Sequence, residues 1–136
     1  MKIMLDEGAI LPTRAHETDA GLDLYSREDK VVPARGSAFF DTGVHIQLPE
    51  DTCGEIISRS GLNVKHNLTS TGLIDVGYTG SIGVKLYNHS DKDYFVKRGD
   101  KISQLKISPI IRPFLEVVDE LEDTDRGSGG FGSTGR

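Results

Sequence analysis

The chain has 136 residues, of which 36% are hydrophobic and 27% are charged, and its formal net charge is −5. This size and composition predict one folded domain with a real core, and the acidic charge argues against binding to nucleic acid or acidic membranes through a basic face. Cys53 is the only cysteine, which excludes an internal disulfide and a cysteine-rich zinc site.

The segment at residues 1–7 turns acidic early and lacks the apolar run of a signal peptide. No apolar run in the sequence approaches the length of a membrane span. We therefore expect a cytoplasmic protein that does not associate with membranes.

Short apolar runs separated by glycine, proline and polar turns recur along the chain, and none has sustained helical periodicity. This pattern predicts an all-β domain with at most one short helix, within residues 62–67. The expected strands lie within residues 2–5, 21–25, 38–40, 44–48, 53–58, 82–87, 94–96, 102–107 and 114–118. Four histidines occur without the spacing of metal ligands, and we assign no role to His16, His45, His66 and His89.

Asp23 lies between Leu22 and Leu24 in the second expected strand. Side chains alternate across a strand, so the carboxylate faces away from both leucines. From this pattern alone, Asp23 is either a metal-related carboxylate or an ordinary exposed strand residue.

The triplet Arg59-Ser60-Gly61 follows another expected strand. Arginine offers forked, charge-assisted hydrogen bonds to phosphate, and glycine allows close backbone approach. The alternative is a surface arginine before a helix that Ser60 caps, which is the commoner meaning of such a triplet taken alone.

The stretch at residues 72–80 reads Gly-Leu-Ile-Asp-Val-Gly-Tyr-Thr-Gly. It places one carboxylate, Asp75, between apolar residues and a glycine-rich turn that carries an aromatic residue. A carboxylate held in such a frame is a candidate general base. The alternative is a solvated aspartate in a β-hairpin turn.

In the strand expected at 102–107, Leu105 and Ile107 share one face and Gln104 and Lys106 share the other. After residue 118 the composition changes. Residues 116–125 contain six acids, and residues 126–136 contain five glycines together with one phenylalanine. We expect 119–125 to form an acidic linker and 126–136 a flexible tail.

The tail contains a G-x-G-x-x-G pattern at residues 130–135, but no strand precedes it and no helix follows it, which excludes a dinucleotide-binding fingerprint. The tail nevertheless carries Arg126, bare backbone amides, hydroxyls and Phe131. These groups suit a lid that orders over phosphates and a planar ring.

Taken together, five short motifs in one order resemble the trimeric dUTP pyrophosphatase (dUTPase) family over almost the whole chain. The motifs are Ala20–Ser26, Pro49–Leu62 with its Arg59-Ser60-Gly61, Gly72–Gly80, Arg98–Leu105 and Arg126–Gly135. Each motif is weak alone, whereas five in order are specific.

The resemblance implies a jelly-roll-like, distorted β-barrel over residues 1–118 that assembles as a homotrimer with active sites shared between subunits. It also implies Mg²⁺-assisted hydrolysis of dUTP to dUMP and pyrophosphate, which keeps uracil out of DNA and supplies dUMP for thymidylate synthesis. The enzyme would belong to nucleotide metabolism and would not bind nucleic acid directly.

The resemblance also assigns roles by position. Asp75 would activate the attacking water, and Asp23 would hold Mg²⁺ through water. The predicted substrate-binding residues are Arg59, Ser60, Gly61, Thr69, Gly72, Leu73, Ile74, Tyr78, Gln104, Arg126, Phe131, Gly132, Ser133 and Thr134. Tyr78 would pack under the deoxyribose, and Phe131 would cover the uracil.

Two positions depart from the family pattern. Gly77 stands where the family often has an acidic or polar residue, which removes any paired-carboxylate mechanism. The segment before Gly72 is short, so Thr69 and Asn67 are both candidates for reading uracil.

Two other functions remain open from the sequence. One is a dCTP deaminase-like enzyme, although the aspartate at position 75 and the complete tail favour dUTPase. The other is a dUTP-sensing regulatory module with a protein partner, of the kind ascribed to some viral members of the family.

Overall fold

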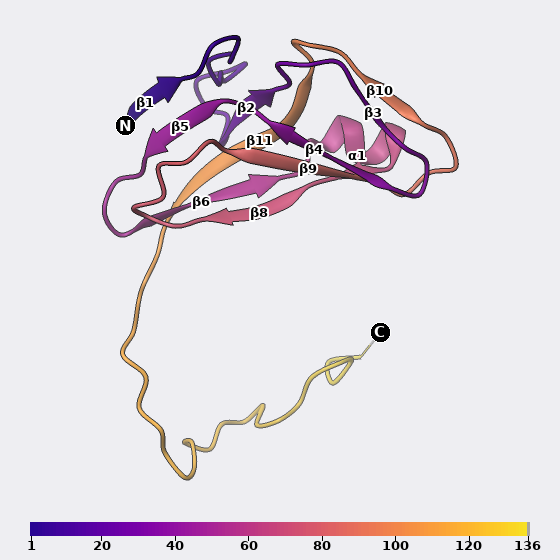
Figure 1. The fold of residues 1–136 in the computed structure, drawn as a ribbon. Coiled ribbons are helices and arrows are strands. Elements are labelled where there is room, and N and C mark those ends of the chain that lie inside the picture. The colour runs from indigo at the N-terminus through magenta and orange to yellow at the C-terminus, as the bar shows by residue number, and fades with distance from the viewer. Residues whose placement is uncertain (136) are drawn as a thin grey trace.

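A computed structural model describes residues 1–135 (Figure 1). It contains eleven strands and one short helix in this part of the chain, which confirms the predicted all-β class. The elements are β1 Lys2–Leu5, β2 Gly21–Tyr25, β3 Lys30–Val32, β4 Ser37–Asp41, β5 Val44–Gln47, β6 Thr52–Ile57, α1 Ser60–His66, β7 Leu68–Thr69, β8 Thr71–Ile74, β9 Gly83–Asn88, β10 Tyr94–Val96 and β11 Lys101–Pro109.

The strands form four antiparallel sheets, ordered β2-β11-β6-β8, β4-β9-β7, β1-β5 and β10-β3. The long strand β11 lies at the centre of the largest sheet, between β2 and β6. Neighbours in a sheet are therefore distant in sequence, and the motifs on these three strands come together.

The alternating strands bury their apolar side chains in one core. Leu24, Phe40, Val84, Leu86 and Leu105 are each at most 1% exposed. A β-bulge between Lys101 and Ser103 lets consecutive residues Ile102 and Ser103 both face inward, which strict alternation does not allow. Cys53 is also buried in this interior and is a free cysteine.

The helix begins two residues earlier than predicted, at Ser60. Arg59 occupies the N-cap position in an extended conformation and makes no side-chain capping bond. The alternative that Ser60 caps the helix is therefore wrong, since Ser60 is already the first helical residue.

The strand predicted at residues 114–118 is absent, which corrects the sequence interpretation. This segment pairs with no other strand of the described chain, and Phe114 is fully exposed. Figure 1 shows the C-terminal segment leaving the folded body after β11. An apolar β-like pattern that no neighbouring strand completes cannot form a sheet, because strand formation depends on a partner.

No helix in residues 1–135 has the length and apolar character needed to cross a membrane.

A matched pair of valine substitutions tests the core. Val84 is 0% exposed and Val64 is 80% exposed. We expect Val84→Ala to lower the free energy of unfolding by about 2 kcal/mol, because it removes two methyl groups and leaves a cavity. Val64→Ala should change it by no more than about 0.5 kcal/mol. Urea denaturation at one fixed protein concentration measures both values, and equal effects would contradict the assigned core.

Candidate active site

Strand pairing brings the first predicted residues together. In the largest sheet, Gln104 of β11 lies opposite Asp23 of β2 on one side and Ile57 of β6 on the other. Arg59 follows β6 directly. Three residues from distant motifs thus meet at one end of three adjacent strands.

Asp23 is paired with two cations. Its Oδ1 lies 3.2 Å from Arg59 Nε, and its Oδ2 lies 2.8 Å from Lys101 Nζ. The Asp23 side chain is 15% exposed, and both cations remain about one third exposed at 33% and 35%. The hydrogen bond from Lys101 to Asp23 raises the pKa of Lys101, which keeps this ammonium charged.

Hydroxyls of partly buried Ser58 and of buried Ser70 and Ser103 link the end of β6, which precedes Arg59, to β11, which carries Gln104. Ser58 Oγ donates to the Ser70 carbonyl at 3.0 Å and accepts the Ser70 amide at 2.9 Å. Ser70 Oγ and Ser103 Oγ are 2.7 Å apart, and Ser103 Oγ donates to the Ile57 carbonyl. Satisfied buried polar groups of this kind hold a site rigidly.

The Gln104 side chain is positioned by a hydrogen bond to the backbone directly after β6, and the space it occupies depends on glycine at position 21. Its Nε2 donates to the Ser58 carbonyl at 3.0 Å. A Cβ at Gly21 would lie only 2.5 Å from Gln104 Oε1, so the space that Gln104 occupies exists because residue 21 is glycine.

These groups line a polar cavity of about 310 Å³. Its lining includes Asp23, Arg59, Ser60, Gly61, Lys101 and Gln104. A Cβ at Gly61 would meet nothing within 4 Å, so the backbone there faces open space. Two cations, a hydroxyl and an amide around one cavity suit an anionic ligand such as a phosphate chain.

A second cavity, of about 330 Å³, lies beside the turn that carries Asp75. Its lining includes Phe39, Leu73, Asp75, Tyr78 and Gly83. Asp75 is exposed, and its backbone carbonyl accepts the Tyr78 amide at 3.1 Å, which closes the turn. This cavity therefore combines an aromatic wall with one accessible carboxylate.

Two glycines shape this turn. A Cβ at Gly80 would lie 2.5 Å from Tyr78 Oη, so the phenol ring packs directly on the backbone of residue 80. Gly77 has φ +92°, a left-handed conformation that glycine adopts without strain, and a Cβ there would meet nothing within 4 Å. Glycine at position 77, which departs from the family pattern, is thus favoured by the left-handed backbone conformation. A polar side chain at this position would project into open space.

The two cavities have no lining residue in common. The tail joins neither, since beyond Arg112 the hydrogen bonds of the described residues link tail groups only to one another. Phe131 is fully exposed, and Arg126 Nε donates to the Gly129 carbonyl at 2.8 Å. Gly132, Ser133 and Thr134 are also exposed. One chain therefore does not bring all predicted residues together.

The two candidates for a uracil-reading side chain lie elsewhere. Thr69 Oγ1 is 2.7 Å from His89 Nε2 on the β7–β9 side of the fold. Asn67 is the left-handed C-cap of α1, with φ 55°. Neither residue lines the cavity at the Asp75 turn.

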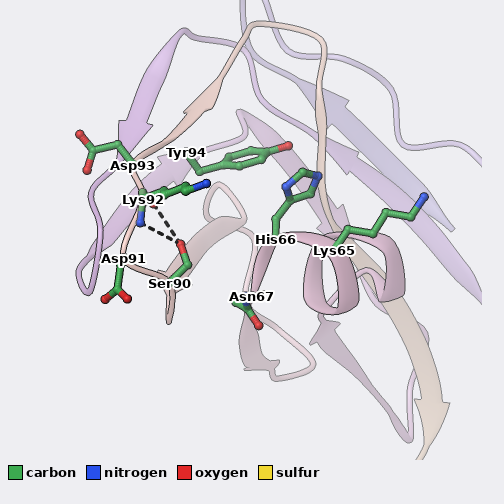
Figure 2. Close-up of a pocket in the computed structure, with 8 residues that line it drawn as sticks. All are labelled: Lys65, His66, Asn67, Ser90, Asp91, Lys92, Asp93 and Tyr94. Carbon is green, nitrogen blue, oxygen red and sulfur yellow. Dashed lines mark hydrogen bonds between the residues drawn. The ribbon is translucent and has the colours of Figure 1, made fainter.

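Asn67 instead lines a cavity of about 470 Å³ at the C-terminal end of α1 (Figure 2). The two carboxylates there are already engaged: Asp91 pairs with Arg35 at 2.7 Å, and Asp93 accepts the Ala34 amide at 2.8 Å. In Figure 2 these carboxylates point away from the His66 ring. Although this cavity is larger, it holds none of the predicted site residues, and we do not assign the site to it.

Sequence reasoning missed two residues of these cavities. Lys101 lies within the Arg98–Leu105 motif; the register of β2 and β11 places it opposite Tyr25, and its side chain reaches the Asp23 carboxylate two residues along β2. Phe39 was detectable because consecutive phenylalanines in a strand must face opposite ways; Phe40 is buried and Phe39 is 57% exposed.

Among residues 1–135, no three His, Cys, Asp or Glu side chains converge as they would around a tightly chelated metal ion. Asp23, the predicted metal-related carboxylate, lines the polar cavity together with Asp19, which accepts the His16 amide at 2.9 Å. One carboxylate fits Mg²⁺, which commonly keeps several waters and binds through one or two carboxylates plus substrate phosphates.

A small β-fold with a polar cavity that contains two cations, and a separate cavity with an aromatic wall and one carboxylate, is suited to the class of nucleotide hydrolases. The dUTPase family model matches residues 7–135. The chain belongs to the dUTPase family.

Individual relatives agree. A deoxyuridine 5'-triphosphate nucleotidohydrolase of Clostridium acetobutylicum is 48% identical over 134 residues, which cover 96% of this chain and 92% of the relative. Among solved structures, the dUTPase of Staphylococcus bacteriophage 80alpha with dUPNHPP superimposes with a TM-score of 0.94 at 34% identity, covering 99% of this chain and 98% of that chain. A mutant dUTPase of S. aureus phage phi11, described with a coordinated structural Mg(II) ion, has a TM-score of 0.83 at 33% identity, covering 90% of this chain and 98% of that chain.

Proposed function

We propose that this chain hydrolyses dUTP to dUMP and pyrophosphate. The observation that carries the proposal is the Asp75 turn: a family-matched stretch that presents one accessible carboxylate beside an aromatic cavity. A carboxylate is an adequate general base when it holds a water in line with the α-phosphorus. Asp75 orients and deprotonates that water.

The polar cavity receives the triphosphate. Arg59 and Lys101 supply positive charge, and Ser60 and Gln104 supply neutral donors. Phosphoryl transfer depends mainly on such positioning and charge neutralisation.

The uracil pairs with the edge of β8. This strand is the last in its sheet, so the outer edge of residues 72–74 has no strand partner in its sheet. Fixed backbone donors and acceptors discriminate strongly, because a cytosine would leave them mismatched. Tyr78, seated on Gly80, packs under the deoxyribose and leaves no room for a 2′-hydroxyl.

Asp23 would hold Mg²⁺ through its water shell. When bound with the substrate, Mg²⁺ supplies neutralisation of the phosphate charge. The position of Asp23 in the lining of the polar cavity supports this assignment, which does not require direct chelation of the ion by protein side chains.

The active form is a homotrimer in which each site combines residues from several subunits. Two features support this arrangement: the cavities of one chain share no residue, and the tail reaches neither. In addition, the C-terminal segment exposes Ile111, Phe114, Leu115 and Val117, each at least 91% exposed. Several large apolar side chains exposed within one short segment call for a partner surface.

Pyrophosphate release from dUTP, UTP, dTTP and dCTP tests the proposal. We expect dUTP to be preferred over each competitor by about 10²-fold or more in kcat/KM, since mismatched buried hydrogen bonds and a closed sugar pocket penalise the others. Ammonia released from dCTP would instead indicate the deaminase alternative. Comparable rates with dUTP and UTP would contradict the role of Tyr78.

A further inference from the structure

His45 contacts the loop that follows the Asp75 turn. Its strand, β5, pairs with the N-terminal strand β1, and the ring projects from the outer face of that pair. His45 Nδ1 lies 2.7 Å from the Thr79 carbonyl oxygen, and Nε2 lies 3.1 Å from Asp6 Oδ1. Thr79 directly follows Tyr78, the residue packed on Gly80.

Both partners of the ring are acceptors. A backbone carbonyl and a carboxylate carry no hydrogen to give, so both His45 nitrogens must donate for both bonds to form. Only the doubly protonated ring does so. The neutral ring has one N–H and keeps one of the two bonds.

Separate hydrogen bonds attach the same loop at Ser81. Ser81 Oγ donates to Asp41 Oδ1 and accepts the Gly43 amide, while Ser81 O accepts the Tyr78 hydroxyl at 3.0 Å. The chain that follows Tyr78 is thus attached at two points, at Thr79 by His45 and at Ser81 by Asp41 and Gly43. Removing the His45 attachment leaves Tyr78 held by its amide bond to Asp75, by its packing on Gly80 and by its hydroxyl bond to Ser81.

We propose that His45 is a positioning residue that sets the placement of Tyr78 through the Thr79 carbonyl, and thereby sets the discrimination between deoxyribose and ribose substrates. The effect on substrate discrimination rests on the proposed dUTP hydrolysis. The hydrogen bond between His45 and the Thr79 carbonyl is present in the free chain and does not depend on that function. His45 touches no predicted substrate-contacting atom and acts only through the loop.

Several charged groups surround the ring. Two carboxylates lie near it, Asp6 after β1 and Asp41 at the end of β4. Arg27 Nη1 is 4.0 Å from Asp6 Oδ2, and Arg27 Nη2 is 2.8 Å from Asp41 Oδ2. Lys2 lines the adjoining cavity of about 250 Å³. The Thr79 carbonyl, followed by the Asp6 hydrogen bond, raises the pKa of His45 above its ordinary value. Both bonds are therefore present below pH about 6.5 and one is lost as the pH rises through the raised value.

Hydrogen exchange of the free protein gives a test that needs no substrate. We expect the Tyr78 amide, which donates to the Asp75 carbonyl, to lose protection in His45→Ala, and in the parent chain as the pH rises through the His45 titration, once intrinsic exchange is corrected for pH. His45→Asn keeps a donor close to the Nδ1 position and lacks the titrating ring, so it should restore part of the protection with no pH step. Gln47→Ala is the matched control, because Gln47 lies two residues along the same strand, lines the same cavity and makes no side-chain hydrogen bond within residues 1–135.

The kinetic test is the ratio of kcat/KM for dUTP to that for UTP. His45→Ala should lower this ratio roughly three- to tenfold, because a loosened Tyr78 rejects the 2′-hydroxyl less well. Partial unfolding would reduce both rates equally and leave the ratio unchanged. Asp6→Asn should lower the pH at which the ratio changes, since it removes the charge that favours the protonated ring.

The results separate the two proposals. Absence of dUTP hydrolysis by the parent chain refutes the proposed function, and the exchange data still decide the attachment. An unchanged substrate ratio in His45→Ala, or unchanged protection of the Tyr78 amide, overturns the positioning role. Equal changes in Gln47→Ala would also overturn it.

Discussion

Asp75→Asn is expected to reduce kcat for dUTP by roughly 10²- to 10⁴-fold while leaving nucleotide binding within about threefold, because the amide fills the same space but cannot accept a proton. The side chain makes no hydrogen bond within residues 1–135, so the turn, which is closed through the Asp75 carbonyl, should fold unchanged. Rapid-quench turnover and calorimetric titration with dUPNHPP measure the two quantities separately.

Asp91→Asn is the matched control. Asp91 is 82% exposed, forms a surface ion pair with Arg35, and lines neither cavity of the predicted site. Such pairs contribute little, so this variant should retain the parent kcat. A second variant, Asp75→Glu, keeps the carboxylate and displaces it by one methylene, and should also lose most of the turnover. Full turnover by Asp75→Asn would remove Asp75 from the role of general base.

The positions of several strands can be predicted from the sequence, whereas their order in the sheets cannot. Alternation in β5 and β9 predicts strands correctly, because one face of each is buried and the period of two is preserved. The order of strands does not follow from alternation: nothing local says that β11 lies between β2 and β6. The five ordered motifs supply that information only through the family resemblance.

For the candidate site, too, the sequence indicates single residues, whereas only the fold shows which of them lie together. Asp23, Arg59 and Gln104 are each ambiguous in the sequence, and strand pairing brings them to one cavity. Lys101 becomes part of that cavity only through the bulge and register of β11. His45 had no assigned role, because its partners Asp6 and Thr79 are separated from it by 39 and 34 residues. Tertiary contacts of this kind leave no local pattern.

The strand wrongly predicted at residues 114–118 has a related cause. The segment is apolar and has strand propensity, yet in one chain it has no partner. Strand propensity describes the fit of a side chain to a half-buried sheet surface. In the proposed trimer that surface would belong to a neighbouring subunit, and the apolar pattern at 114–118 would then correspond to a subunit interface rather than to the core of one chain.

Removal of residues 126–136 is expected to leave folding and assembly intact and to reduce kcat/KM for dUTP by roughly 10²- to 10⁴-fold. The folded body does not depend on the tail, because the described tail forms hydrogen bonds only within itself. Catalysis would lose the stacking of Phe131, about 1–3 kcal/mol, and the charge-assisted contacts of Arg126, about 1.5–3 kcal/mol. Phe131→Ala alone should show a smaller loss, and Phe131→Trp should restore most of it.

Mixing two inactive proteins decides whether the tail acts on a neighbouring subunit. Chains that lack 126–136 keep Asp75, and Asp75→Asn chains keep the tail. If each site takes Asp75 from one subunit and the tail from another, co-refolded mixtures should regain a substantial share of the parent activity, with the maximum at intermediate ratios. If one chain supplied both groups, every site in the mixture would lack one of them. Activity that stays at the level of the separate variants, with mixed assemblies verified by mass, would therefore refute the shared site.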